Sequence, residues 1–232
     1  MSVVTQAELE TPRSAADMLP WALAAHHRFT ATPQLRAMAR EGRCFAKQIV
    51  QEALPMARFA HRYFSASPHV MITHVIGNQS YDGKVDDGRT PRGHVSFIEV
   101  TDSTWDHNEA LRMELLTRDG HAPALGRVEA AGARGRRTVL HGHAEMRDVG
   151  ATPTLPLDRI REVVAAKAAK SYPDGTALVV HVDDVLQFHE PAHVAALRAL
   201  ATTELIPLLA GREFRVLAID GATHLGLCYE LC

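Results

Sequence analysis

The chain has 232 residues, a formal net charge of -2 and a sequence pI near 6.7, which exclude a global electrostatic attraction to nucleic acid or to an anionic membrane. The three cysteines are odd in number and lack zinc-ribbon spacing, so they favour a reducing cytosol over a disulfide framework. No signal peptide and no apolar run of membrane-spanning length is evident. We therefore expect a cytoplasmic protein without membrane contact, with a helical extension over residues 1–32 and a single α/β domain over residues 33–232.

Apolar residues at helical spacing indicate that the first part of the chain is helical. Ser14 suits the N-cap of a first helix, and Pro33 suits the first turn of a second. The predicted helices run from Ala15 to Phe29 and from Pro33 to about Phe64, the second with irregularities at Gly42 and Pro55.

Three short strands joined by turns follow, over residues 69–76, 81–86 and 95–101. The second begins with Asp82-Gly83, where the glycine lets the backbone bend or lets a ligand approach closely. The third carries Glu99 near its end. Pairing of these two strands places Asp82 and Glu99 side by side, an arrangement that suits a divalent cation.

The remaining chain alternates helices and strands. A continuous apolar run over residues 176–182 is typical of a buried parallel strand. The other predicted elements are helices over 105–118, 157–170 and 191–209 and strands over 137–145, 214–219 and 225–231. This order predicts an α/β fold with a mixed central sheet flanked by helices.

Over roughly residues 34–182, the predicted elements follow the order helix, three-strand meander, helix and strand. This order resembles the core of the restriction-endonuclease-like nucleases, the PD-(D/E)XK superfamily. In that family an Asp, often followed by Gly, lies early in the second strand, and an acid and a lysine two residues apart lie on the third. Asp82-Gly83 resembles the first half of this motif, and Glu99-Val100-Thr101 resembles the second, with Thr101 where the lysine is expected. The resemblance implies a nuclease that uses Mg²⁺ or Mn²⁺ to hydrolyse phosphodiester bonds in DNA or RNA.

Asp82 and Glu99 would be the metal ligands of such a site. Two basic residues are candidates to replace the missing lysine. Lys84 shares a strand face with Asp82 and is slightly preferred over Arg112, because a guanidinium stays protonated and stabilises charge rather than acting as a base.

Many members of the superfamily hold a third acid on the helix before the meander. Glu52 is the candidate for a third metal ligand here, with Glu41 almost equally well placed. The most concentrated basic patch of the chain comprises Arg134, Arg136 and Arg137, which we expect to contact phosphates.

Two other functions are weighed against this one. The departure at Thr101 allows a degenerate member of the superfamily that has lost hydrolysis and serves as a binding or assembly module. His189-Glu190-Pro191-Ala192-His193 matches the H-E-x-x-H pattern of zinc hydrolases, but a proline at the third position places His189 and Glu190 at or before the start of a helix. The oligomeric state is left open, with a homodimer as one alternative.

Overall fold

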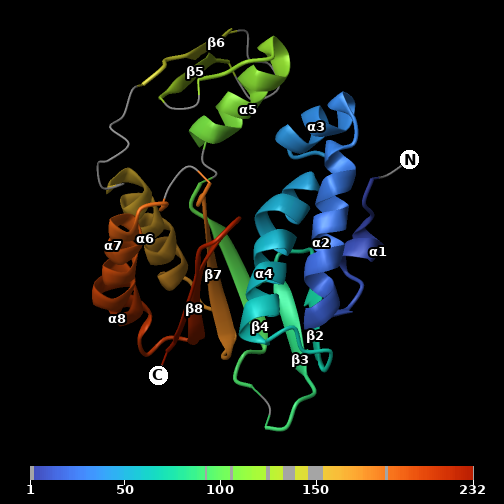
Figure 1. The fold of residues 1–232 in the computed structure, drawn as a ribbon, viewed down its shortest axis with the longest axis vertical. Coiled ribbons are helices and arrows are strands. Elements are labelled where there is room, and N and C mark those ends of the chain that lie inside the picture. The colour runs from blue at the N-terminus through green and yellow to red at the C-terminus, as the bar shows by residue number, and fades with distance from the viewer. Residues whose placement is uncertain are drawn as a thin grey trace.

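The computed structural model describes residues 3–91, 93–104, 107–123, 126–132, 139–145, 154–185 and 188–231. Most of these form three layers with a sheet between two sets of helices, while residues 107–123, 126–132 and 139–145 lie beyond one end of that sheet (Figure 1). The sheet has seven strands in the order β1-β2-β3-β4-β7-β8-β9. The strands are β1 (Arg13–Ser14), β2 (Val70–His74), β3 (Gly83–Asp87), β4 (Phe97–Asp102), β7 (Thr176–Val182), β8 (Phe214–Gly221) and β9 (Gly226–Glu230). The prediction of a mixed sheet flanked by helices is confirmed.

Strand direction follows from the connections. Strands β2, β3 and β4 form an antiparallel meander, and β4, β7 and β8 are parallel neighbours. The parallel pairs need crossovers, which helices provide. Because neighbouring strands of the meander run in opposite directions, β2 and β4 end, and β3 begins, at the same edge of the sheet.

Helices cover both faces of the sheet (Figure 1). The helical elements are α1 (Gln6–Leu9), α2 (Ala15–Thr30), α3 (Pro33–Arg40), the π-helical η1 (Gln48–Ala53), α4 (Leu54–Tyr63), α5 (His107–Asp119), α6 (Thr154–Ala168), α7 (Pro191–Leu200), the π-helical η2 (Ala201–Leu205) and α8 (Ile206–Leu209). One core lies between the sheet and α2 and α4, and a second between the sheet and α6, α7 and α8. The N-terminal segment belongs to the first core, since α2 contacts α4 and β1 pairs with β2.

The alternation of side chains on β4 divides it between the two cores. Ile98 and Val100 belong to the core under α4. Glu99 is in register with Leu178 of β7, which belongs to the core under α6. Side chains at paired positions of a sheet share a face, so Glu99 is directed toward α6.

The structure departs from the predicted elements in the second helix and in the middle of the chain. The helix predicted over 33–64 is broken between α3 and η1, where Gly42, Cys44 and Phe45 adopt positive φ angles, and η1 is followed directly by α4. The irregularity predicted at Gly42 is thus confirmed, but it ends the helix. Strand β6 (Val139–Gly142) pairs with an unpredicted strand, β5 (Val128–Ala131), in a separate two-stranded sheet beside α5.

Contrary to the expectation of no apolar segment of membrane-spanning length, the described part of the chain contains one helix that meets this criterion by length and composition, Pro191–Leu209. This helix includes α7, η2 and α8. Leu197, Leu200, Leu205 and Leu209 are buried in the core under the sheet. The helix is thus a layer of the fold, which is compatible with a soluble protein.

Candidate functional site

A cavity of about 420 Å³ opens at the edge of the sheet where β2 and β4 end. Its walls come from η1, from the residue before β3, from β4, from α5 and from α6. The lining residues are Lys47, Gln51, Glu52, Asp82, Glu99, Val100, Thr101, Asp102, Ala110 and Lys167. Three acids that the sequence singled out, Glu52, Asp82 and Glu99, therefore lie in one cavity.

Asp82 is held against β4 by its backbone and its side chain. Its N–H donates to the Ile98 carbonyl at 2.8 Å, and its Oδ2 accepts from the Val100 N–H at 2.8 Å. Burial, together with the negative charges of Glu99 and Glu52, raises the pKa of Asp82 from 3.8 to about 7. The carboxyl group of Asp82 is thus poised between its neutral and charged forms at neutral pH, and a neighbouring cation would favour the carboxylate.

Gly83 explains how the helix layer approaches this site so closely. A Cβ atom at position 83 would lie 2.6 Å from Sδ of Met56, which is fully buried on α4. A side chain at this position would push α4 away from β3. The glycine after Asp82 therefore allows α4, and η1 before it, to bring Glu52 to the cavity.

Glu99 is 7% exposed and is contacted from α6 and the loop after it. Lys167 Nζ donates a short hydrogen bond to Glu99 Oε1, and the Tyr172 hydroxyl lies 3.5 Å from the same oxygen. Burial raises the pKa of Glu99, and the Lys167 ammonium opposes that rise. Glu99 and Lys167 thus form a largely buried ion pair that lines the cavity.

Lys47 and Lys167 are basic residues at the site that sequence reasoning missed, and Lys167 is the one that contacts a predicted site residue. The motif position Thr101 lines the cavity without a charge, whereas Lys167 enters it from a different element. The sequence offers one indication of this role: Lys167 lies on the inward side of a predicted helix, next to the apolar row of Ile160, Val164 and Ala168. Such a lysine must have a buried partner, but the sequence does not say which one.

The two basic residues proposed to replace the missing lysine do not line the cavity. Lys84 Nζ lies over the ring of Tyr81, 5.9 Å from its centroid. Arg112 forms an ion pair with Glu109 and donates to the Gly126 carbonyl at 2.7 Å. Arg112 thus ties α5 to the loop before β5.

Of the two candidates for a third acid, only Glu52 lines the cavity, while Glu41 pairs with Arg43 at 2.8 Å. Glu52 Oε2 lies 3.1 Å from Nε2 of His74 on β2. The predicted phosphate contacts, Arg134, Arg136 and Arg137, lie outside the described residues.

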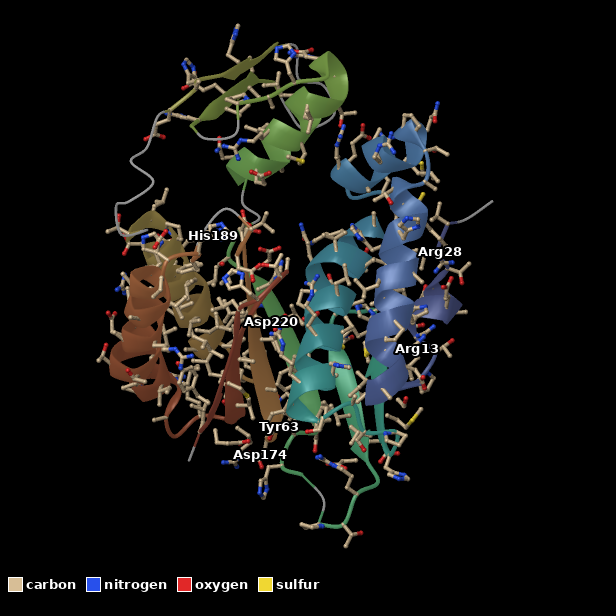
Figure 2. The ribbon with its side chains drawn as sticks, viewed as in Figure 1. Arg13, Arg28, Tyr63, Asp174, His189 and Asp220 are labelled. Atoms are coloured by element: carbon tan, nitrogen blue, oxygen red, sulfur yellow. The ribbon has the colours of Figure 1, made fainter. Side chains whose placement is uncertain are left out.

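The H-E-x-x-H segment has the geometry that its proline predicted. Glu190 is the N-cap of α7, and Pro191 is the first helical residue, so His189 precedes the helix. His189 stacks on His224 with ring centroids 5.8 Å apart, near the start of α7 (Figure 2). His193 is buried in the helix.

The chemistry of the cavity suits a hard cation better than zinc. Its acidic donors are carboxylate oxygens, which Mg²⁺ and Mn²⁺ prefer. Within the described ranges, no group of three or more His, Cys, Asp or Glu side chains is close enough to hold a metal ion. A cation between Asp82 and Glu99 would therefore keep several water ligands, as Mg²⁺ commonly does.

No family model matches the chain, and the searches of curated proteins and of solved structures find no match.

Proposed function

We propose that the protein is a cytoplasmic, metal-dependent nuclease that hydrolyses phosphodiester bonds of DNA or RNA. Asp82 and Glu99 hold the Mg²⁺ or Mn²⁺ ion, and Glu52 is a further acid that lines the same cavity. Lys167 supplies the positive charge of the lysine that Thr101 replaces. The observation that carries this proposal is the convergence of Asp82, Glu99 and Lys167 from three elements on one cavity. The order of the elements, a helix and an antiparallel meander followed by a parallel strand, supports it.

Each residue has a chemical part in this function. A bound divalent cation supplies Lewis-acid stabilisation of charge on the phosphate and lowers the pKa of a coordinated water. The Asp82 and Glu99 carboxylates would hold this cation, Asp82 from the residue before β3 and Glu99 from β4. The Lys167 ammonium, held by Glu99, lies where it can stabilise negative charge on a phosphate oxygen or orient the attacking water.

A binding or assembly module without hydrolysis is the second candidate. It is favoured by the ion pair of Glu99 with Lys167 and the contact with Tyr172, which already satisfy one Glu99 oxygen as a structural pair would. On this alternative, the protein binds nucleic acid in a strongly salt-dependent manner and leaves it uncut.

Cleavage of single-stranded and double-stranded DNA and RNA with Mg²⁺ or Mn²⁺ tests the proposal. Asp82→Asn, Glu99→Gln and Lys167→Met should each lower the rate by about 100-fold or more, with folding checked by circular dichroism. Glu41→Gln is the matched control, because Glu41 lies outside the cavity. If the wild-type protein cuts none of these substrates, or if the three variants retain wild-type rates, the nuclease proposal is wrong.

A further inference from the structure

A row of three titratable residues crosses the sheet beside the cavity. Asp102 of β4 is in register with His181 of β7, and His181 is in register with Asp220 of β8. These parallel strands place the row at their carboxyl ends, on the face covered by α4, since Val179 lies two residues before His181 and is buried in the core under that helix. Asp102 also lines the cavity. The row therefore extends the polar surface of the site along the edge where α/β sheets commonly bind ligands.

His181 presents a free hydrogen-bond acceptor. Its Nδ1 lies 3.1 Å from the carbonyl oxygen of Asp220, and because a carbonyl only accepts, Nδ1 carries the hydrogen. Nε2 has no hydrogen-bond partner among the described residues. Burial lowers the pKa of His181, an effect that the Asp102 carboxylate opposes and the Arg58 guanidinium reinforces. The neutral imidazole thus offers a lone pair on Nε2.

Asp220 adds a second acceptor without a partner. Its side chain is almost fully buried, and its Oδ1 forms the ion pair with Arg62. Its Oδ2 makes no hydrogen bond to any described residue. The row therefore requires hydrogen-bond donors from a ligand rather than further acceptors.

Arg58 faces the row from α4. Its positive charge acts on His181 and on the carboxyl group of Asp220. Arg58 is partly buried, yet it takes part in no hydrogen bond or ion pair within the described part of the chain. A guanidinium in this position can donate to a phosphate oxygen of a ligand.

A ribonucleotide carries both groups that this surface needs. The sugar–phosphate backbone of DNA offers only acceptors, at its phosphate and ester oxygens. The 2′-hydroxyl group of RNA can donate, and it lies beside a phosphate. The acceptor on His181 and the donor on Arg58 therefore match RNA better than DNA.

We propose that His181 is a specificity-determining residue whose Nε2 accepts a hydrogen bond from a 2′-hydroxyl group of the bound strand, so that the substrate is RNA rather than DNA. Arg58 donates to the phosphate next to that ribose. The inference rests on the proposed function, because it takes a nucleic acid as the ligand of the cavity. It adds the choice between RNA and DNA, which the acids of the cavity leave open.

Fluorescence anisotropy of labelled single strands with the Asp82→Asn protein, which should not cut them, tests the inference. An RNA strand without uracil should bind about 5-fold more tightly than the DNA strand of the same sequence, which corresponds to about one hydrogen bond. A 2′-fluoro strand keeps an RNA-like sugar but cannot donate, so it should bind as weakly as DNA.

Two substitutions separate the nitrogens of His181. His181→Asn can still donate to the Asp220 carbonyl but has no atom at the place of Nε2, so it should remove the preference for RNA. His181→Gln, whose amide oxygen can reach the place of Nε2, should retain part of it. Arg58→Ala should weaken the binding of RNA and DNA alike, because both carry the phosphate.

Val179→Ala is the control for a purely structural role, since Val179 lies on the same face of β7 and is fully buried. It should lower stability in urea and leave the ratio of RNA to DNA affinity unchanged. If RNA and DNA bind equally, or if His181→Asn keeps the preference, the inference is wrong and the nuclease proposal survives. If neither strand binds, the inference is wrong, and cleavage by the wild-type protein decides the nuclease proposal separately. A 2′-fluoro strand bound as tightly as RNA would overturn the inference even if His181→Asn does not fold.

Discussion

At the scale of single residues, the ion pair between Lys167 and Glu99 has the clearest energetic consequence. Their side chains are 19% and 9% exposed. Lys167→Met leaves a buried carboxylate without a counter-charge, so we expect the free energy of unfolding to fall by about 3 kcal/mol at pH 7. Urea unfolding measures this loss, and the exposed Lys170→Met is the matched control, with an expected change within about 0.5 kcal/mol.

The loss in Lys167→Met should depend on pH. Burial already raises the pKa of Glu99, and removal of the ammonium raises it further. A protonated Glu99 needs no counter-charge, so the difference from the wild type should shrink as the pH falls through the pKa of Glu99. An equal loss of stability at pH 7 and pH 4 would contradict this account of the pair.

Asp82 gives a second prediction that depends on pH. The pKa of Asp82 is about 7 in the folded protein, and it is 3.8 when burial and the neighbouring charges are lost on unfolding. Between these two pH values, the folded state therefore holds a proton that the unfolded state has lost. Stability therefore falls as the pH rises from about 4 to 7. Asp82→Asn still accepts from the Val100 N–H, and in EDTA it should exceed the wild type in stability above pH 7 by up to about 4 kcal/mol. Urea unfolding at several pH values measures the difference, which should vanish below pH 4. Parallel stability curves for the two proteins would show that Asp82 does not titrate in this way.

At the scale of elements, the contact between α4 and β3 is set by a glycine. Gly83→Ala places a methyl group against Met56, which we expect to cost about 1–3 kcal/mol in the free energy of unfolding. Met56→Ala opens the same space and leaves a cavity. The double variant Gly83→Ala, Met56→Ala should lose less stability than the sum of the two single variants, as measured by urea unfolding. Strict additivity would show that the two residues are not in contact.

The predicted elements differ in how well local sequence determined them. Residues 176–182 are apolar except for Thr176 and His181, because both faces of β7 are covered, and the predicted strand has the observed bounds. The irregularity predicted at Gly42 is confirmed by its positive φ angle, because glycine signals such a conformation locally. The positive φ angles of Cys44 and Phe45, which extend the break, are indicated by no local preference. Strand β5 was missed because its pairing with β6 is stabilised by packing on α5, which four residues of sequence do not reveal.

At the scale of the whole molecule, a net charge of -2 means that nucleic-acid binding must come from a local set of cations. Lys47 and Lys167 line the cavity, and three arginines of the basic patch are expected to contribute. For five contacts with a single strand, the logarithm of the binding constant should fall with the logarithm of salt concentration with a slope of about -3.5.

Fluorescence anisotropy of a labelled oligonucleotide with the Asp82→Asn protein measures this slope. Replacing Arg134, Arg136 and Arg137 by alanine should reduce its magnitude by about 2, since each lost phosphate contact contributes about 0.7. Arg161→Ala is the control, because Arg161 of α6 is already paired with Asp158 and with Glu204 of η2. An unchanged slope in the triple variant would exclude the patch from binding.

Contacts between distant segments hold the layers together. Arg62 of α4 forms an ion pair with the buried Asp220 of β8 and donates to the Leu225 carbonyl at 2.8 Å. Burial raises the pKa of Asp220 to about 7, although Arg62 and Arg58 oppose the rise. These residues are far apart in the chain, so no sequence pattern pairs them.

The sequence alone determined the α/β class, most of the strands, and the pairing of Asp82 with Glu99, because these depend on side-chain periodicity and on short connections. Only the tertiary structure decided which residues complete the site. Lys167 reaches Glu99 from a helix on one face of the sheet, and His74 reaches Glu52 across the other core. A lysine two residues after the acid would have been visible in the motif, whereas one 68 residues later meets it only when α6 packs on β4. The physical reason is that local sequence specifies how a segment folds, while packing of the layers specifies which segments meet.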